Sequence, residues 1–333
     1  MLAPPADGRI YRAAFPDFGG TEDHVTGARI RSFERLSGSG IAWAYFSNNW
    51  FKGRIHFPEE HVRTVSRAGT VPFIRMMART GYHRGRDPNF SMQSIADGSW
   101  DPELRDWCDG ARDAGVPLLV EFGTEVNGDW FPWNGRWNGA GRTNGYGNPQ
   151  VPDGPERFRD AYRRIVDLCR AEGASNITWF FHADVGGWPR TSWNRISQYW
   201  PGSRYVDWIG LSDYGPLKPG QPWLGFRRRL DRVYDHVKAL GPEPIAILEY
   251  GAAEQWSHPA RKARWLREAI GDVAAGRWPR VRALSYWNER WRNGDGSVSN
   301  LHIDSSRHSL RAYRHGIGRG VFTSHAGFVQ RGT

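Results

Sequence analysis

The amino-acid sequence predicts one closed (β/α)8 barrel, the TIM barrel of the α/β class. Eight apolar or β-branched runs alternate with stretches whose apolar residues recur at helical spacing, which indicates repeated βα units. Eight such units in one chain favour a closed barrel over an open sheet. No Gly/Ser linker or change of composition divides the 333 residues. We therefore expect a single domain over 1–333, with the barrel core at about 9–316 and a short C-terminal appendage at 317–333.

The strands are expected where short runs are rich in β-branched, aliphatic and aromatic residues. In chain order they occupy residues 9–15, 41–47, 70–78, 117–125, 176–184, 206–214, 244–250 and 281–287. Because parallel barrel strands all end at one face, residues that close these strands should meet at a common mouth.

Helices are predicted between most strands, since apolar residues recur three or four positions apart. They cover 58–69, 100–115, 228–241 and 260–276, and a further helix lies within "RFRDAYRRIVDLCRAEG" at 157–173. Several end in glycine, which favours a left-handed helix cap. The first helix, within 21–37, and the helix after the fifth strand, around 193–200, are poorly specified. The number of eight units therefore depends on the strands.

The two cysteines, Cys108 and Cys169, lie on the apolar faces of predicted helices. Buried, free thiols are the expected state, and a disulfide between neighbouring helices is the alternative.

The formal charge of +10 raises the question of a nucleic-acid partner, but the arginines are spread along the chain. The densest run, "RRR" at 227–229, opens a predicted helix and is interpreted as a solvated face. We expect no nucleic-acid partner. No run of about 18 apolar residues occurs, so we expect no membrane span either. The first residues lack the features of a secretory signal; a removed signal would leave the same picture, and localisation stays open.

Tryptophan is concentrated at the predicted barrel mouth. Ten of the 18 tryptophans lie at or just after strand ends: Trp50, Trp130, Trp133, Trp137, Trp188, Trp193, Trp223, Trp256, Trp287 and Trp291. They are interleaved with Asn, Asp, Gly and Arg rather than with aliphatic residues, which favours sugar binding over a protein interface. The long segment 126–155 has little secondary-structure signal and holds several of these rings. A loop of that length and composition indicates function.

Two glutamates close predicted strands. Glu125 ends the fourth strand in "LLVEFGTEVNGDWFPWNG", and Glu249 ends the seventh in "AILEYG". Retaining glycosidases need two carboxyl groups about 5–5.5 Å apart, one protonated and one ionised. Fixed strand ends can hold such a pair at one mouth.

These motifs resemble those of glycoside hydrolase family 26, whose best-known members are endo-β-mannanases. "TEVNGDWFPWNG" is similar to the acid/base motif of the family, and "ILEYG" is similar to its nucleophile strand. Further likeness lies in "FRDAYRRIVDLCRAEGASNITW", "YWPGSRYVDWIGLSDYG" and "DSSRHSLRAYRHG", in the order of the family. The resemblance covers about residues 9–316 and implies a retaining glycosidase.

By this resemblance Glu125 corresponds to the general acid/base and Glu249 to the nucleophile. Tyr214 corresponds to a tyrosine that hydrogen-bonds the nucleophile, and Trp287 to the aromatic floor beneath the sugar. Trp130 and Trp133 correspond to the aromatics after the acid, and Asn127 is interpreted as a turn cap. Trp50 is a further candidate for substrate binding.

One position departs from the family pattern. Family members commonly place His directly before the acid, whereas this chain has Thr124. A threonine hydroxyl carries no charge, so the pKa of the acid should differ from that in the family. The sugar hydroxyl bound at this position should differ as well. The reaction is therefore better specified than the substrate.

Several other polar residues lie near the predicted mouth. Glu121 shares a strand face with Glu125 and is interpreted as a buried ion-pair partner, for example of Arg75. His182 and Asp184 end the fifth strand; substrate contact and a structural role are both open. Glu254 and Glu289 lie in loops of the same face; solvated acids are the default, and lining of sugar subsites is the alternative. Oxygens of "NGDGSVSN" at 293–300 lack the spacing of a known Ca²⁺ loop.

The sequence thus predicts a retaining, endo-acting glycoside hydrolase that cuts a β-linked polysaccharide. The polymer is expected to be mannan-like or related to mannan, and an acidic polymer is one alternative. A carbohydrate-binding or transglycosylating protein on the same barrel is the competing hypothesis. No cofactor or metal ion is expected, and the chain is expected to be a monomer. The function favours a secreted or periplasmic location.

Overall fold

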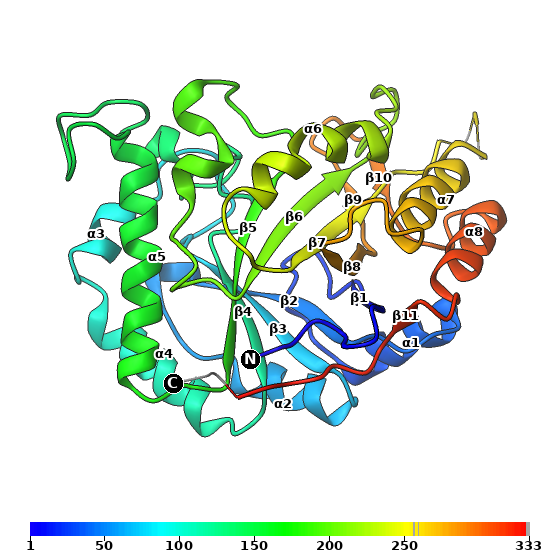
Figure 1. The fold of residues 1–333 in the computed structure, drawn as a ribbon, viewed down its shortest axis with the longest axis horizontal. Coiled ribbons are helices and arrows are strands. Elements are labelled where there is room, and N and C mark those ends of the chain that lie inside the picture. The colour runs from blue at the N-terminus through cyan, green and yellow to red at the C-terminus, as the bar shows by residue number, and fades with distance from the viewer. Residues whose placement is uncertain (256, 259, 331–333) are drawn as a thin grey trace.

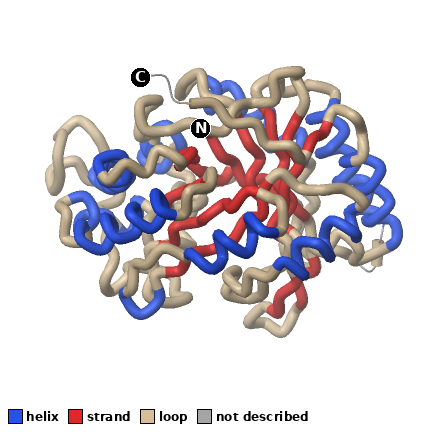
Figure 2. The backbone as a smooth tube through the Cα atoms, turned by 90° about the horizontal axis from the view of Figure 1, so that it is seen from below, coloured by secondary structure: helices blue, strands red, loops and turns tan. Residues whose placement is uncertain are grey.

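The computed structural model describes residues 1–255, 257–258 and 260–330, and it confirms the closed (β/α)8 barrel. Eight parallel strands pair in chain order, and β1 pairs with β8 to close the sheet. Figure 1 shows the strands at the centre of the molecule with helices around them, and Figure 2 shows the same arrangement from below. The barrel strands are β1 (Ile10–Phe15), β2 (Trp43–Asn49), β3 (Val71–Met77), β4 (Leu118–Phe122), β5 (Ile177–Asp184), β6 (Trp208–Tyr214), β7 (Ile245–Gly251) and β8 (Val281–Trp287).

The helices lie outside the sheet and bury their apolar faces against it. They are α1 (Gly27–Ser37), α2 (Glu59–Arg67), α3 (Met92–Ala96), α4 (Asp101–Asp113), α5 (Asp153–Ala171), α6 (Phe226–Lys238), α7 (Ala260–Ala274) and α8 (Arg307–Ile317). Short 3-10 turns occur at η1 (Phe51–Gly53), η2 (Gly135–Trp137), η3 (Ser192–Asn194) and η4 (Ile196–Tyr199). A hairpin of β9 (Arg290–Arg292) and β10 (Val298–Asn300) follows the last barrel strand, and β11 (Phe322–Thr323) pairs with the start of β1.

Two elements differ from the sequence prediction. In the described part of the chain, the connection from β5 to β6 holds the 3-10 turns η3 and η4 instead of an α-helix. The fourth strand ends at Phe122 and not at residue 125, because Gly123 and Glu125 have positive φ angles of 71° and 47°. Left-handed backbone cannot continue a strand, so Glu125 projects from a turn.

The barrel interior consists of an aromatic layer below and a polar layer above. Phe180 is the centre of the aromatic layer, since its ring lies 4.7 Å from Phe73 and 5.7 Å from Trp208. Two residues further along the same strands come Arg75 and His182, which face the same side because side chains alternate along a strand. Layers of inward side chains are typical of these barrels. Here the upper layer is charged, directly beneath the mouth.

The cysteines are not free, so the prediction of two free thiols is wrong. Cys108 of α4 and Cys169 of α5 form a disulfide, with their Cα atoms 4.8 Å apart. The helical spacing correctly predicted that both side chains face the protein interior. It could not predict that α4 and α5 pack side by side, which brings the two inward faces together.

We expect the disulfide to be detectable and stabilising. Alkylation under denaturing conditions without reductant should label no cysteine, and alkylation after reduction should label both. Because the bond joins residues 61 apart in the sequence, replacing both cysteines by serine should lower the free energy of unfolding by roughly 2–4 kcal/mol. Two labelled thiols in the unreduced protein would show that the bond is not formed.

The N-terminal and C-terminal segments close the base of the barrel. The Leu2 amide donates to Thr178 Oγ1 at 2.7 Å, and Trp208 Nε1 donates to the Leu2 carbonyl at 2.9 Å. The Met1 amino group in turn donates to the Val329 carbonyl at 2.8 Å. Figure 1 shows the first segment and the segment after α8 running together. Within the expected C-terminal appendage, Phe322 and Thr323 therefore contact the barrel by pairing with the start of β1.

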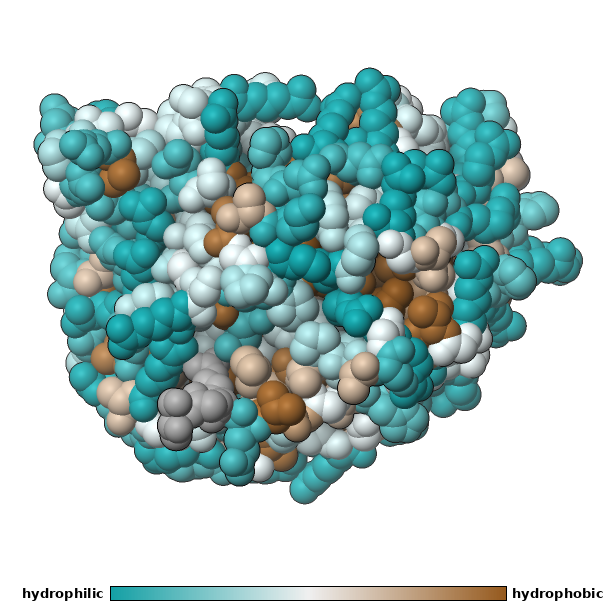
Figure 3. All heavy atoms as spheres, in the orientation of Figure 1, coloured by the Kyte–Doolittle hydropathy of each residue, from teal (hydrophilic) through white to brown (hydrophobic). Residues whose placement is uncertain are grey.

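The surface is mainly hydrophilic on the face that Figure 3 shows, with hydrophobic residues in small separate groups. Many arginines have acidic partners: Arg227 pairs with Asp272, and Arg229 reaches the fully buried Asp213 at 2.8 Å. The run at 227–229 is therefore only partly the solvated face that the sequence predicted. Among the described helices none is long and apolar enough to cross a membrane.

Candidate active site

A cavity of about 790 Å³ opens at the carboxyl ends of the barrel strands. Its wall combines carboxylates, arginines and aromatic rings contributed by the loops after several strands. It includes Glu22, Arg75, Glu125, Trp130, Phe131, Asp184, Arg190, Tyr214, Arg229, Glu249, Trp287, Glu289, Trp291 and Arg292. The two glutamates that end predicted strands thus face one common space.

Glu125 stands in the turn after β4 and is almost completely buried. Its carboxylate oxygen Oε2 accepts a hydrogen bond from Trp130 Nε1 at 2.7 Å. The next amide, that of Val126, donates to the His182 carbonyl at 3.1 Å, which ties the turn to β5. A glutamate with φ of 47° is strained, and such strain is typical of functional sites.

Glu249 lies inside the barrel near the end of β7 and has three polar partners. Tyr214 donates to Oε2 at 2.8 Å, and Arg75 Nη2 lies 3.3 Å from Oε1. The Thr124 hydroxyl donates to Oε1 at 3.5 Å. Burial and the neighbouring Glu249 hold the pKa of Tyr214 well above its usual range, so this hydroxyl remains a donor. The contact between Tyr214 and Glu249 is the one that the resemblance implied.

The environments of the two carboxyl groups differ. Burial, together with the neighbouring Glu249 and Asp184, raises the pKa of Glu125 to about 8. Burial also raises the pKa of Glu249, but the adjacent Arg75 guanidinium and His182 oppose this shift. A direct cation favours the ionised form. Among the described residues, Glu249 has such a cation in Arg75 and Glu125 has none. The arrangement can therefore hold a proton on Glu125 beside an ionised Glu249.

Glu121 belongs to the polar layer below the cavity, and it forms the ion pair with Arg75 that the sequence predicted. Arg75 Nε lies 3.5 Å from Glu121 Oε1, and Tyr45 donates to the same oxygen at 2.5 Å. The other oxygen lies 2.7 Å from His182 Nδ1. Burial opposes ionisation of Glu121, but His182, Arg75 and Tyr45 hold its pKa below the usual range.

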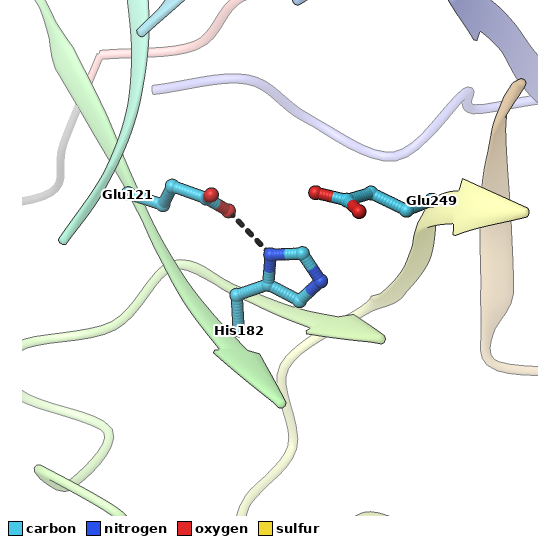
Figure 4. Close-up of side chains that lie close together, drawn as sticks. All are labelled: Glu121, His182 and Glu249. Carbon is cyan, nitrogen blue, oxygen red and sulfur yellow. Dashed lines mark hydrogen bonds and ion pairs between the residues drawn. The ribbon is translucent and has the colours of Figure 1, made fainter. Parts of the chain in front are cut away.

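Three of these side chains lie close enough to hold a metal ion. The ligand atoms of Glu121, His182 and Glu249 all lie within 4.8 Å of one another (Figure 4). Arg75 already neutralises both carboxylates from 3.3 and 3.5 Å. A guanidinium in that place competes with a cation, so we assign no metal to the cluster.

The tryptophans expected to bind sugar divide into exposed and buried ones. Trp130 is 38% exposed, and it lines the cavity together with Trp287. Trp133 and Trp50 are completely buried. Trp133 donates from Nε1 to the Thr124 carbonyl at 2.7 Å, which fixes the turn that carries Glu125. Neither buried ring can offer a face to a sugar in this conformation, which differs from the sequence prediction.

Of the remaining predicted site residues, Asp184 lines the cavity and the others lie behind its wall. Asn127 is structural: its side-chain amide donates to the Asp184 carbonyl, and its side-chain oxygen accepts from the Asp184 amide, both at 2.8 Å. Asp184 lines the cavity and accepts from the amides of Gly186 and Gly187 at 2.6 and 2.7 Å. His182 and Thr124 are fully buried and lie beneath the wall.

Glu289 and Glu254, the two loop acids that were expected to be solvated, are both buried. Glu289 is buried in the cavity wall, where it accepts from Trp287 Nε1 at 2.8 Å, and burial raises its pKa to about 8. Glu254 is buried outside the cavity and accepts from Ser305 and Ser309, both at 2.9 Å. In the hairpin at 293–300, Asp295 accepts from the amide of Ser297 at 3.0 Å.

Sequence reasoning did not identify Glu22 as a wall residue. It lies in the loop after β1, where Ser47 Oγ donates to its Oε2 at 2.6 Å and Arg75 Nη1 at 2.7 Å. The only available signal was its position after a strand end, which it shares with many loop residues.

We expect Trp133 and Trp130 to respond differently to replacement by alanine. Trp133→Ala should lower the free energy of unfolding by roughly 3–5 kcal/mol, because it removes a large buried ring. Trp130→Ala should leave unfolding nearly unchanged and weaken oligosaccharide binding, because the ring is partly exposed. Urea unfolding and titration calorimetry measure the two effects. Equal loss of stability in both variants would contradict this division.

Comparison with known proteins agrees with the motifs. Residues 101–237 match the model of glycosyl hydrolase family 26. The chain is 27% identical over 309 residues to Endoglucanase H of Acetivibrio thermocellus, covering 87% of this chain and 29% of that protein. It is 24% identical over 247 residues to mannan endo-1,4-beta-mannosidase A and B of Caldalkalibacillus mannanilyticus, covering 70% and 42%. This chain thus spans less than half of the length of either relative.

Solved structures share the fold at low sequence identity. The Bacillus subtilis mannanase man26 matches with a TM-score of 0.59 and 18% identity, over 85% of this chain and 81% of that one. The catalytic domain of the family 26 endo-β-1,4-mannanase from Bacillus sp. JAMB-750 matches with a TM-score of 0.65 and 16% identity, over 95% and 87%. The resemblance drawn from the motifs is confirmed by the sequence comparisons, and the barrel by the structural ones.

Proposed function

We propose that this chain, a glycoside hydrolase similar to family 26, cleaves a β-linked polysaccharide with retention of configuration, using Glu125 as acid/base and Glu249 as nucleophile. The observation that carries the proposal is the pair of unlike carboxyl groups at one cavity. Glu249 has Arg75 as a direct cation, whereas burial holds a proton on Glu125. Double displacement needs one ionised and one protonated carboxyl group.

In the first step, the Glu249 carboxylate attacks the anomeric carbon and the glycosidic bond breaks. Glu125 gives its proton to the departing oxygen, so the first sugar product leaves as an alcohol. In the second step, Glu125, now ionised, takes a proton from water, and the resulting hydroxide displaces Glu249 from the anomeric carbon. The sugar is released with its original configuration, and both carboxyl groups return to their starting states.

The other wall residues support binding of a sugar chain. Trp287 stacks on Phe15 with ring centroids 4.1 Å apart, so it is held as a rigid floor. Trp130 and Trp291 add aromatic surface to the wall. Flat rings combined with a few polar groups suit the apolar faces and the hydroxyls of sugars.

The substrate within this class is proposed at the level of a β-linked polysaccharide cut internally. Similar proteins are named for different polymers: an endoglucanase, a mannan endo-1,4-beta-mannosidase and a beta-1,3-xylanase. Mannan is one candidate, and an acidic polymer is another, since Arg190 and Arg292 line the cavity. Digesting neutral and acidic polysaccharides and analysing the products by mass spectrometry would separate these candidates. Release of only terminal units would contradict internal cleavage.

The proposed reaction predicts a specific response to Glu125→Ala. Substrates whose leaving groups need protonation should lose roughly 10²–10⁴-fold in kcat, while substrates with very good leaving groups should keep their first step. In the unmodified enzyme, kcat/KM should fall above about pH 8, where Glu125 loses its proton. Azide added to the variant should yield a glycosyl azide of retained configuration.

Proton NMR of the first product from the unmodified enzyme tests the stereochemistry directly. A product of inverted configuration would refute the roles given to both glutamates. Tight oligosaccharide binding without cleavage of any polymer would instead support the competing hypothesis of a carbohydrate-binding protein.

A further inference from the structure

Arg229 lines the cavity, and the reaction described above gives it no role. It lies in the first half of α6, and its guanidinium reaches the carboxyl ends of β5 and β6. Asp213 of β6 is fully buried, and its Oδ1 lies 2.8 Å from Arg229 Nε. No other cation among the described residues forms an ion pair with Asp213. A buried carboxylate is costly without a cation, so Arg229 is held firmly in this place.

The two terminal nitrogens of the guanidinium are available to a ligand. Nη2 lies 3.9 Å from Asp184 Oδ2, which is beyond hydrogen-bond distance. Within the described part of the chain, neither Nη1 nor Nη2 has a hydrogen-bond acceptor, and neither belongs to the buried polar atoms that lack one. The Arg229 side chain is 21% exposed at the cavity wall. Its Nε therefore faces the protein, while its other N–H donors remain accessible.

Arg229 lies beside the loop that follows β5, and this loop is joined to the turn that carries Glu125. The Asn127 side chain exchanges two hydrogen bonds with the backbone of Asp184, both at 2.8 Å. A methyl group added at Gly186 of the loop would lie 3.5 Å from Arg229 Nη2. The guanidinium thus lies on the same side of the cavity as the proposed acid/base.

Trp287, the proposed floor, lies on the other side of the mouth. It ends β8 and stacks on Phe15 of β1. Because the eight strands pair in chain order and β1 closes on β8, β5 lies across the barrel from β1. In the proposed reaction the sugar bonded to Glu249 rests on Trp287, so the departing sugar extends toward β5 and β6.

We propose that Arg229 binds hydroxyl oxygens of the departing sugar, and that Asp213 is the positioning residue that holds its guanidinium in place. The inference rests on the proposed function, which defines the two sides of the bond that breaks. Asp213 and Asp184 already balance the charge of Arg229, so an uncharged sugar suits this place better than one with a carboxylate. The planar guanidinium offers its remaining N–H donors in fixed directions, and neighbouring hydroxyls of a sugar ring supply the acceptors.

The same place also holds a sugar that replaces water in the second step. The hydroxyl of this acceptor gives its proton to Glu125, and its oxygen bonds to the anomeric carbon as the bond to Glu249 breaks. A new glycosidic bond is formed, and both carboxyl groups return to their starting states. Arg229 should therefore influence how often transfer to a sugar competes with hydrolysis.

The test compares substrates with different leaving groups. The para-nitrophenyl β-mannobioside releases a phenol without sugar hydroxyls, whereas mannotetraose releases a saccharide; para-nitrophenyl β-cellobioside and cellotetraose form a second pair. The measured quantity is the ratio of kcat/KM for the tetrasaccharide to kcat/KM for the aryl glycoside. Arg229→Gln combined with Asp213→Asn removes both charges, so no buried charge is left alone. The ratio should then fall roughly 10- to 100-fold, because hydrogen bonds from a charged donor are lost.

Single variants separate the two residues. Asp213→Asn keeps the guanidinium but weakens its hold, so the ratio should fall by a smaller factor. Arg229→Lys keeps a cation beside Asp213 and serves if the double variant does not fold; its ratio should also fall, since the planar fork is lost. With mannobiose as acceptor, the share of transfer products should decrease in the same variants.

The matched control is Arg227→Lys in the same helix. Arg227 Nε donates to Asp272 Oδ2 at 2.7 Å, outside the cavity, so the ratio and the share of transfer products should not change.

A structural defect would lower kcat/KM for both substrates of a pair and leave their ratio unchanged. That result would overturn the role of Arg229 and leave the proposed function intact, and an equal fall of the ratio in Arg227→Lys would overturn it as well. If the unmodified protein cleaves none of the four substrates, the proposed function is refuted for these linkages, and the binding of a departing sugar with it. A lower ratio and less transfer in the variants of Arg229 and Asp213, with an unchanged control, support both.

Discussion

Replacing Glu249 by alanine should reduce hydrolysis of every substrate by roughly five orders of magnitude or more. The reason is that the covalent intermediate cannot form without this carboxylate. The variant should fold, because alanine removes a charge whose burial raises its own pKa. Added azide should restore cleavage of substrates with good leaving groups by occupying the vacated space. The glycosyl azide formed should have inverted configuration, since the small anion attacks from the side of the missing carboxylate.

The control for this experiment is Glu254→Ala. Glu254 is a buried glutamate outside the cavity, where it accepts from Ser305 and Ser309. Its loss should cost stability and leave the activity of the folded fraction unchanged, with no effect of azide. Residual activity of Glu249→Ala above a few per cent, or an azide product of retained configuration, would assign the nucleophile elsewhere.

Replacing Arg75 by methionine should have a large effect on stability. Its guanidinium lies 2.7 Å from Glu22, 3.5 Å from Glu121 and 3.3 Å from Glu249, and the Arg75 side chain is only 3% exposed. Removing one partner of a buried ion pair leaves an uncompensated charge and costs roughly 3–5 kcal/mol. Urea unfolding at pH 7 measures the loss. Arg63→Met, which removes an exposed pair within α2, should change stability by less than about 0.5 kcal/mol.

The pH dependence of the stability of Arg75→Met follows from the carboxylates that Arg75 contacts in the unmodified protein. Arg75 lowers the pKa of Glu249, so its removal raises that pKa further above the value in the unfolded chain. A carboxyl group whose folded pKa is raised binds more protons in the folded state, and stability then falls as pH increases. The deficit of the variant should therefore shrink as pH is lowered toward 5. A deficit that is constant between pH 5 and 8 would show that lost packing, and not charge, causes it.

The sequence was sufficient for the barrel because each strand could be recognised by itself. Apolar runs and helical spacing are local patterns, and the closure of eight units follows from their number. The same logic placed Glu125 and Glu249 at one mouth. It extended the fourth strand to Glu125, however, because the left-handed turn at Gly123 and Glu125 has no strong composition signal.

The parts of the site that sequence reasoning missed depend on contacts between distant segments. Trp130 and Trp133 are three residues apart and chemically alike, yet only Trp130 faces the cavity, because Trp133 packs on Phe131 with ring centroids 4.5 Å apart. The partners of His182 come from β2, β4 and β6, so no window of sequence contains them. The disulfide depends in the same way on the packing of α4 against α5.

The meeting of Met1 and Val329 at the barrel base separates these segments from the cavity. Met1 and Val329 are hydrogen-bonded at the pole opposite the cavity, beside the first residues of β5 and β6. A tag, a surface tether or a fused module joined beside Met1 or Val329 would leave the mouth unobstructed. Because Met1 and Val329 are neighbours, a short peptide could also link them into a ring, with new ends opened in a surface loop by circular permutation. The fold thus leaves one pole for attachment and the cavity at the other pole open.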